Sequence, residues 1–197
     1  DAKENRGIKP LPNLEFKFVC ANSLIALPKK DQQSSFFKEA TEDIVILKSL
    51  RAEYLGSYGV EKRRVEKKFL EVQSRMAKHA LSGALWGGEK SQTMKLSQWN
   101  PFSETPCYWF DPEWMFGIKE GYDVVIANPP YIDGRGLTET ELKALKDIYF
   151  SAQGKVNLFN LFQEKAQHIL RKFGISTFII PTPFLRNDRY CAYSGLP

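Results

Sequence analysis

The residues Asn128-Pro129-Pro130-Tyr131 have the chemistry to hold a planar amine. The side-chain oxygen of Asn128 and the carbonyl oxygen of Pro129 are both acceptors, so together they can take the two hydrogens of an exocyclic amino group. The ring of Tyr131 can stack on a flat heteroaromatic ring. Such a clamp would hold the nitrogen lone pair towards an electrophile. The alternative is structural, with two prolines that end a strand and a packed tyrosine after them.

A predicted strand positions this tetrapeptide. The run from Tyr122 to Ala127 contains Val124, Val125 and Ile126 in succession, and such a run is typical of a strand covered on both faces. The prolines stop the strand because neither can donate a ladder hydrogen bond, and the residue before a proline favours extended backbone. We therefore expect the tetrapeptide at the carboxyl end of a strand, where open α/β sheets bind ligands.

Together with its strand, the tetrapeptide resembles motif IV of the amino-methyltransferases that use S-adenosylmethionine (SAM), in the form typical of N6-adenine DNA methylation. Other segments are similar to large bacterial restriction–modification methyltransferases, including type IIG enzymes, and to related phage-defence methylases. These segments are Cys20 to Leu24, Phe110 to Gly117, and Asn157 to Phe162 continuing through Ile180 to Leu185. Four segments in the family's order cover most of the chain and are far more specific than one.

The resemblance implies an α/β fold, a fragment of a Rossmann-like SAM-dependent methyltransferase sheet with a helical-hairpin insertion. It implies methyl transfer from SAM to adenine N6 in double-stranded DNA, within a restriction–modification or phage-defence system. The catalytic residues would be Asn128, Pro129, Pro130 and Tyr131, acting on a base flipped out of the duplex and stacked on the tyrosine. Asn22 and Asn128 would contact the cofactor, although a turn-forming asparagine also explains Asn22. The mechanism needs no metal.

One part of the family pattern is missing from the sequence. The SAM site of this fold is built around a Gly-rich loop, and no Asp/Asn-Pro-x-x-Gly-x-Gly string occurs. We therefore expect the middle of a methyltransferase domain, inactive alone. Because sheet edges would be unpaired, it should either be poorly stable or place the strand at 16–20 differently. Two alternatives stay open: a protein-glutamine or RNA-base N-methyltransferase, and an inactive truncated remnant or DNA-binding fragment.

The chain, residues 1–197, is predicted to be one partial methyltransferase domain. A short strand at Phe16 to Cys20 precedes a helical insertion at 34–82 that breaks at Gly56 to Gly59. Apolar residues spaced three and four apart form a stripe on each arm: Phe37, Ala40, Ile44, Leu47 and Tyr54, then Val65, Phe69, Val72 and Met76. A basic cluster could contact DNA phosphates, but interspersed glutamates favour a solvated face; its members are Lys62, Arg63, Arg64, Lys67 and Lys68.

The rest of the chain is predicted as a loop at 83–109 and, at 110–185, the motif IV strand with its following helix–strand unit. Two helix starts are expected, one at Asp111-Pro112-Glu113 and one at Thr138, where Glu141 completes a capping box. Between them, Asp133 to Gly136 is expected to be a flexible loop of the kind that could order over a substrate. A helix from Val156 to Lys172, closed by Gly174 and carrying a surface histidine (His168), leads to a strand at Ile175 to Ile180.

Composition agrees with these expectations. The formal net charge of +5 is compatible with a nucleic-acid partner. Cys20, Cys107 and Cys191 have no metal-binding spacing and are predicted to be reduced thiols of a cytoplasmic protein. No segment resembles a signal peptide or approaches the ~18 apolar residues of a membrane span. The expected partners are double-stranded DNA and SAM, with restriction and specificity domains or subunits as further candidates and no membrane.

Overall fold

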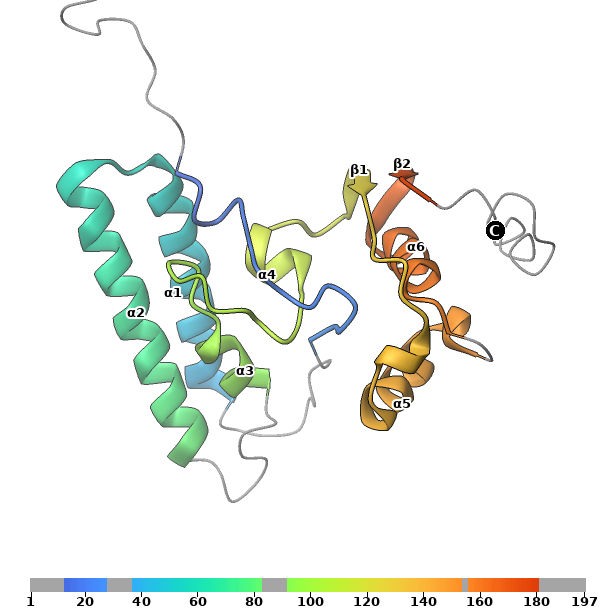
Figure 1. Ribbon diagram of the computed structural model, residues 1–197. Helices are drawn as coiled ribbons and strands as arrows, with labels where there is room; N and C mark the ends of the chain where they lie inside the picture. The colour runs from blue at the N-terminus through green and yellow to red at the C-terminus, as the bar shows by residue number, and fades with distance from the viewer. Residues whose placement is uncertain (1–12, 28–36, 83–91, 154–155, 181–197) are drawn as a thin grey trace, which may run out of the picture. The chain divides into compact units, whose positions relative to one another are not determined.

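The computed structural model describes residues 13–27, 37–82, 92–153 and 156–180 (Figure 1). The chain divides into two compact units, Asp1–Gly117 and Ile118–Pro197. Helices and a small parallel sheet make up the described residues, an arrangement compatible with part of an α/β fold. Each unit is described below by itself.

A helical hairpin dominates the first unit. Helix α1 (Phe37–Gly56) and helix α2 (Gly59–Ser82) pack against each other, and the tight connection ends at Gly59, whose φ of 56° suits glycine. This confirms the predicted hairpin and its break. The buried side chains of the seam are Leu47, Leu50 and Tyr54 from α1 and Val65, Phe69, Val72 and Met76 from α2. The side chains of Phe37 and Ala40 lie outside the described residues.

The strand predicted at Phe16 to Cys20 is wrong. The backbone turns there instead, because the N–H groups of Lys17 and Phe18 both donate to the carbonyl of Leu14, at 2.7 and 3.1 Å. The turn inserts the ring of Phe16 into the hairpin, where it meets four other rings at centroid distances of 5.4 to 6.0 Å. Burial of one large ring in an aromatic pocket outweighs the weak strand preference of this short run.

The loop predicted at 83–109 also needs correction, because it contains helix α3 (Gln92–Gln98). Met94 and Leu96 of this helix are buried, as is Trp99 just after it. The buried side chain of Gln73, on α2, donates to the carbonyls of Leu96 and Trp99, at 3.4 and 2.5 Å. The helix is therefore held by contacts with α2. Because these contacts join residues far apart in the sequence, a local sequence pattern does not predict them.

Helix α4 (Pro112–Phe116) begins where the sequence predicts. The Asp111 side chain accepts a hydrogen bond of 2.6 Å from the N–H of Trp114, which caps the helix. Gly117 ends it in the left-handed region, with φ of 79°. The guanidinium of Arg51, on α1, donates to the carbonyls of Glu113 and Trp114 at 3.1 and 2.5 Å and so fastens α4 to the hairpin.

The second unit contains a two-stranded parallel sheet. Strand β1 (Tyr122–Ala127) pairs with β2 (Leu170–Phe178), and helix α6 (Leu158–Ile169) leads into β2. Helix α5 (Glu139–Ile148) lies between 3-10 turns η3 (Gly134–Gly136) and η4 (Phe150–Ala152). The capping box of α5 forms as predicted, because Glu141 N–H donates to Thr138 while the Glu141 carboxylate accepts from Thr138 N–H.

The burial predicted for β1 is wrong for one face of the sheet. Val124 and Ile126 are 49% and 78% exposed, whereas Val125 and Ala127, which point the other way, are partly covered. Parallel sheets are normally covered by helices on both faces. Among the described residues of this unit, α6 contacts β2, while the face of the sheet that carries Val124 and Ile126 stays exposed.

The boundary between α6 and β2 differs from the prediction of a helix to Lys172 closed by Gly174. Helix α6 ends at Ile169, and Leu170 already has extended backbone. The β2 ladder then bulges, since Tyr122 pairs with Leu170 but Val124 pairs with Ile175. Gly174 serves this bulge, because a Cβ there would lie 2.8 Å from the carbonyl oxygen of Tyr122. The glycine permits a close approach of two strands and does not cap the helix.

Glu164 of α6 provides a test of acid stability in this unit. Its carboxylate accepts hydrogen bonds from the N–H groups of Phe150 and Ser151, at 2.8 and 2.7 Å. Burial raises the pKa of this carboxyl, but the hydrogen bonds from Ser151 and Phe150 outweigh burial, so its pKa lies below the ordinary value of 4.5. The ionised form is therefore the one that the fold favours. The contribution of this carboxylate to the free energy of unfolding is present above pH 4.5, the ordinary pKa. It is lost as pH falls through the lower pKa of the folded state.

Glu164→Gln is expected to lower the free energy of unfolding of the second unit by about 1–2 kcal/mol at pH 7. The difference from the unsubstituted protein should shrink at pH 3, because below pH 4.5 the unfolded state increasingly binds a proton that the folded carboxylate resists. Urea denaturation, followed through the amide NMR signals of this unit at both pH values, measures the effect. Glu120→Gln, at an exposed carboxylate, is the control. An equal destabilisation by Glu164→Gln at both pH values would contradict this account.

Candidate active site at the end of strand β1

The tetrapeptide lies where the sequence predicts, directly after the last residue of β1. Ala127 forms the last pair of the ladder with Phe178, and the N–H of Ile179 then donates to the Ala127 carbonyl at 3.1 Å. Both strands therefore end together at one edge. Pro129 is buried, whereas Asn128 is exposed. The buried proline anchors the corner, and the exposed asparagine amide is available to a ligand.

Tyr131 reaches back to the end of β2. Its hydroxyl donates to the carbonyl of Ile179 at 2.7 Å and lies 3.5 Å from the side-chain oxygen of Asn128. The residue is 49% exposed, so it is not the packed core tyrosine of the structural alternative. An exposed ring held at its hydroxyl end is compatible with stacking on a planar ligand.

The segment after the tetrapeptide is a hydrogen-bonded turn and not the flexible loop that was predicted. The N–H of Gly134 donates to the Val156 carbonyl at 2.8 Å, and the N–H of Leu158 donates to the Ile132 carbonyl at 2.9 Å. Asp133 accepts from the N–H of Arg135 at 3.2 Å and also forms an ion pair with its guanidinium. These bonds fasten the turn to the start of α6.

Asn157 caps α6, because its side-chain oxygen accepts from the N–H of Phe159 at 3.2 Å. The predicted surface histidine, His168, is confirmed, since half of its side chain is exposed. Its ring stacks on Tyr149 with a centroid distance of 5.9 Å. Asn157 therefore begins α6, and His168 packs α6 against Tyr149, the residue that precedes η4.

Asn22 lies in the first unit and takes part in a turn. Its side-chain oxygen accepts from the N–H of Leu24 at 3.2 Å, and its own N–H donates to the Cys107 carbonyl at 2.8 Å. The turn-forming alternative therefore accounts for its oxygen, while the residue stays exposed. Asn22 and Asn128 belong to separate units, and the sequence has no Gly-rich loop. The cofactor-contacting roles of Asn22 and Asn128 therefore stay predictions, and the corner after β1 offers an exposed amide and an exposed ring.

Comparison with known proteins assigns the chain to a family. The family model for the Eco57I restriction-modification methylase matches residues 21–194, a range that includes Asn22 and the whole tetrapeptide. The chain belongs to this family. The resemblance inferred from motif IV and its neighbouring segments is confirmed at the level of a restriction–modification methylase.

Two curated relatives agree with the family. The type II restriction enzyme and methyltransferase RM.Eco57I of Escherichia coli is 34% identical over 70 residues, which cover 34% of this chain and 7% of that protein. RM.MjaORFECS2P of Methanocaldococcus jannaschii, whose name places it in the same class, is 23% identical over 238 aligned positions, covering 94% of this chain and 20% of that protein. The chain thus spans a small part of these relatives. No solved structure matches the chain.

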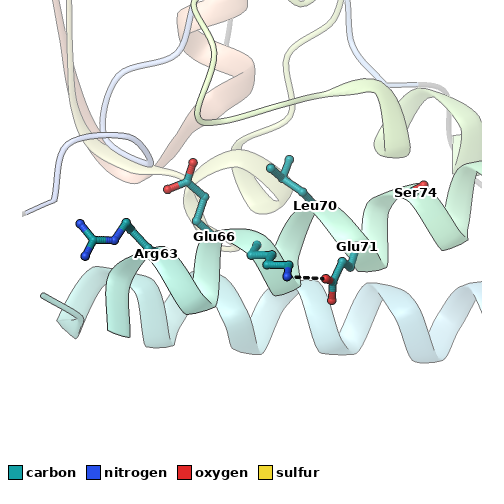
Figure 2. Close-up of a pocket in the computed structure, with 6 residues that line it drawn as sticks. Arg63, Glu66, Leu70, Glu71 and Ser74 are labelled. Carbon is teal, nitrogen blue, oxygen red and sulfur yellow. Dashed lines mark ion pairs between the residues drawn. The ribbon is translucent and has the colours of Figure 1, made fainter. Parts of the chain in front are cut away.

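The basic cluster of α2 is largely neutralised by its neighbours. Lys62 pairs with Glu15 at 2.6 Å, and Arg64 pairs with Glu61 at 2.7 Å. Figure 2 shows the side chains that line a shallow hollow along this helix, where an ion pair of 3.9 Å joins Lys67 and Glu71. The hollow has a volume of about 510 Å³ and is lined by Arg63, Glu66, Lys67, Leu70, Glu71 and Ser74. Alternating charges favour the solvated face expected from the sequence over a phosphate-binding surface.

Three other expectations concern metals, thiols and membranes. Within the part of the chain that the structure describes, no three His, Cys, Asp or Glu side chains gather in a way that could hold a metal ion. Cys20 and Cys107 are free thiols, and Cys191 lies outside the described residues. None of the described helices has the length and apolar character needed to cross a membrane.

Proposed function

We propose that this chain is the base-holding part of a DNA methyltransferase that transfers a methyl group from SAM to adenine N6 in duplex DNA. The observation that carries the proposal is the position of Asn128 to Tyr131, an exposed amide and ring at the carboxyl end of β1 in a restriction–modification methylase. A Rossmann-like sheet, a cytoplasmic location and restriction or specificity partners belong to the same proposal. SAM would supply an electrophilic methyl group.

The proposed roles of the residues follow from their groups. A flipped adenine presents an amino group, whose two hydrogens the Asn128 side-chain oxygen and the Pro129 carbonyl would accept. Such acceptors gain strength as the amino nitrogen becomes positively charged. Tyr131 would stack on the purine, a contact worth about 1–3 kcal/mol in single-strand complexes. Pro129 supports this geometry because it is buried and its φ is fixed.

A methylation assay separates this proposal from its alternatives. The full-length protein that contains this chain is incubated with labelled SAM and, in turn, duplex DNA, RNA and a glutamine-containing protein, and mass spectrometry locates the methyl group. N6-methyladenine in DNA supports the proposal, whereas methylation of RNA or of glutamine supports the corresponding alternative. No transfer together with no heat of SAM binding would support an inactive remnant. Lys143→Ala, on the exposed face of α5, should methylate the same substrate as the unsubstituted protein and serves as the control for a substitution outside the site.

A further inference from the structure

The hydroxyl of Tyr131 occupies a position that the parallel ladder leaves open. In a parallel pair, a residue donates its N–H to one residue of the neighbouring strand, and its carbonyl accepts from the residue two positions further on. The parallel bridge between Ala21 and Cys107 shows the complete pattern. There the N–H of Cys107 donates to the Cys20 carbonyl, and the Cys107 carbonyl accepts from the N–H of Asn22, both at 2.8 Å.

The same rule identifies the missing donor at the end of β1. Since the N–H of Ile179 donates to the Ala127 carbonyl at 3.1 Å, the Ile179 carbonyl should accept from the N–H of residue 129. Residue 129 is a proline and has no N–H. The Tyr131 hydroxyl donates to this carbonyl instead, at 2.7 Å. A side chain two residues later therefore replaces the backbone donor that Pro129 lacks.

We propose that the Tyr131 hydroxyl is a positioning group that fixes the tyrosine ring for base stacking by completing the β1–β2 ladder at the Ile179 carbonyl. The inference rests on the proposed function, because the ring matters only if a base stacks on it. An exposed tyrosine without this bond would turn about its side-chain torsions. With the bond, the ring is held at both ends, by the backbone at residue 131 and by the last carbonyl of the ladder.

This role is distinct from stacking itself, because phenylalanine could stack equally well. The hydroxyl also lies 3.5 Å from the Asn128 side-chain oxygen, so the ring and the amide that would hold the base are neighbours. Through these two contacts the Tyr131 hydroxyl lies next to both the amine acceptor and the end of β2. Loss of the hydroxyl should affect capture of the base and leave the acceptor chemistry of Asn128 in place.

Tyr131→Phe in the full-length protein tests the role of the hydroxyl. Loss of one hydrogen bond is expected to raise KM for DNA by up to about tenfold, with kcat nearly unchanged because Asn128 and the ring remain. Hydrogen exchange of the amides at 178–180 should become several-fold faster, since the Ile179 carbonyl loses its donor. Unchanged KM and unchanged exchange in this variant would overturn the proposal.

A second pair of variants separates positioning from simple strand stabilisation. Pro129→Ala restores a backbone N–H that can donate to the Ile179 carbonyl, so Pro129→Ala with Tyr131→Phe should recover slow exchange at 178–180. KM for DNA should nevertheless stay higher in this double variant than in Pro129→Ala alone, because the ring is no longer held. Equal KM values in the two would show that the hydroxyl only stabilises the strand, which would overturn the proposal.

The outcome of these measurements also separates the inference from the proposed function. Hydrogen exchange needs no substrate, so it tests the ladder even in a protein that methylates nothing. If the unsubstituted protein transfers no methyl group to DNA, the proposed function fails first, whatever the exchange of 178–180 shows. If it methylates DNA and Tyr131→Phe behaves identically, the inference fails while the proposed function stands.

Discussion

Asn128→Ala is expected to lower the rate of methyl transfer by about a hundred- to a thousandfold, the range measured when one hydrogen-bonding partner of a developing charge is removed. In the proposed reaction the amino nitrogen of adenine becomes positively charged as it forms the new bond, and the Asn128 oxygen would stabilise its hydrogens most strongly at that stage. The effect should therefore fall on kcat. Radiolabelled methyl transfer to DNA by the full-length protein measures it.

Two controls distinguish a lost acceptor from a damaged fold. Asn128 is exposed, so its truncation should leave the thermal unfolding of the second unit unchanged. Asn128→Asp keeps an oxygen acceptor at the same distance from the backbone and should retain more activity than Asn128→Ala. SAM binding, followed by calorimetry, should be mostly intact in both variants. Full activity of Asn128→Ala would remove Asn128 from the mechanism.

The parts of the site that could be predicted depend on local chemistry. Pro129 and Pro130 prevent continuation of a strand wherever they occur, so the end of β1 follows from the sequence. The caps at Asp111 and Thr138 likewise need only residues three positions apart. The hydroxyl bond from Tyr131 to Ile179 joins residues 48 positions apart. No sequence pattern identified that contact, because its acceptor is a backbone carbonyl that every residue carries.

The errors in the predicted fold have the same origin. Gly174 was assigned to a helix end because glycine commonly follows a helix, but the close approach of the Tyr122 carbonyl determines its place in a bulge. Helix α3 depends on Gln73, which is 23 and 26 positions away from the carbonyls that it binds. The hairpin, in contrast, was predictable because each of its arms carries its own apolar stripe. Periodicity shows a buried face and does not show what covers it.

Phe16→Ala is expected to destabilise the first unit by about 3–5 kcal/mol, the usual cost of removing a fully buried aromatic side chain. The ring is 2% exposed and lies at the centre of the seam, within 5.4 to 6.0 Å of the rings of Tyr54, Phe69, Trp99 and Phe102. These side chains come from α1, from α2 and from the segment after α3, so one cavity would loosen all three elements. Tyr54 and Phe69 would face a void in the middle of the hairpin.

Phe18→Ala is the matched control, because it removes the same ring two residues away from a side chain that is 73% exposed. All four tryptophans precede residue 118, so urea denaturation followed by tryptophan fluorescence reports on the first unit alone. The free energy of unfolding should fall by about 3–5 kcal/mol for Phe16→Ala. It should fall by at most about 0.5 kcal/mol for Phe18→Ala. Equal losses would contradict this account, because they would mean that both rings are buried alike, as two residues on one face of a strand would be. A large loss at Phe16 alone would establish that this segment contributes to the fold through one inserted ring.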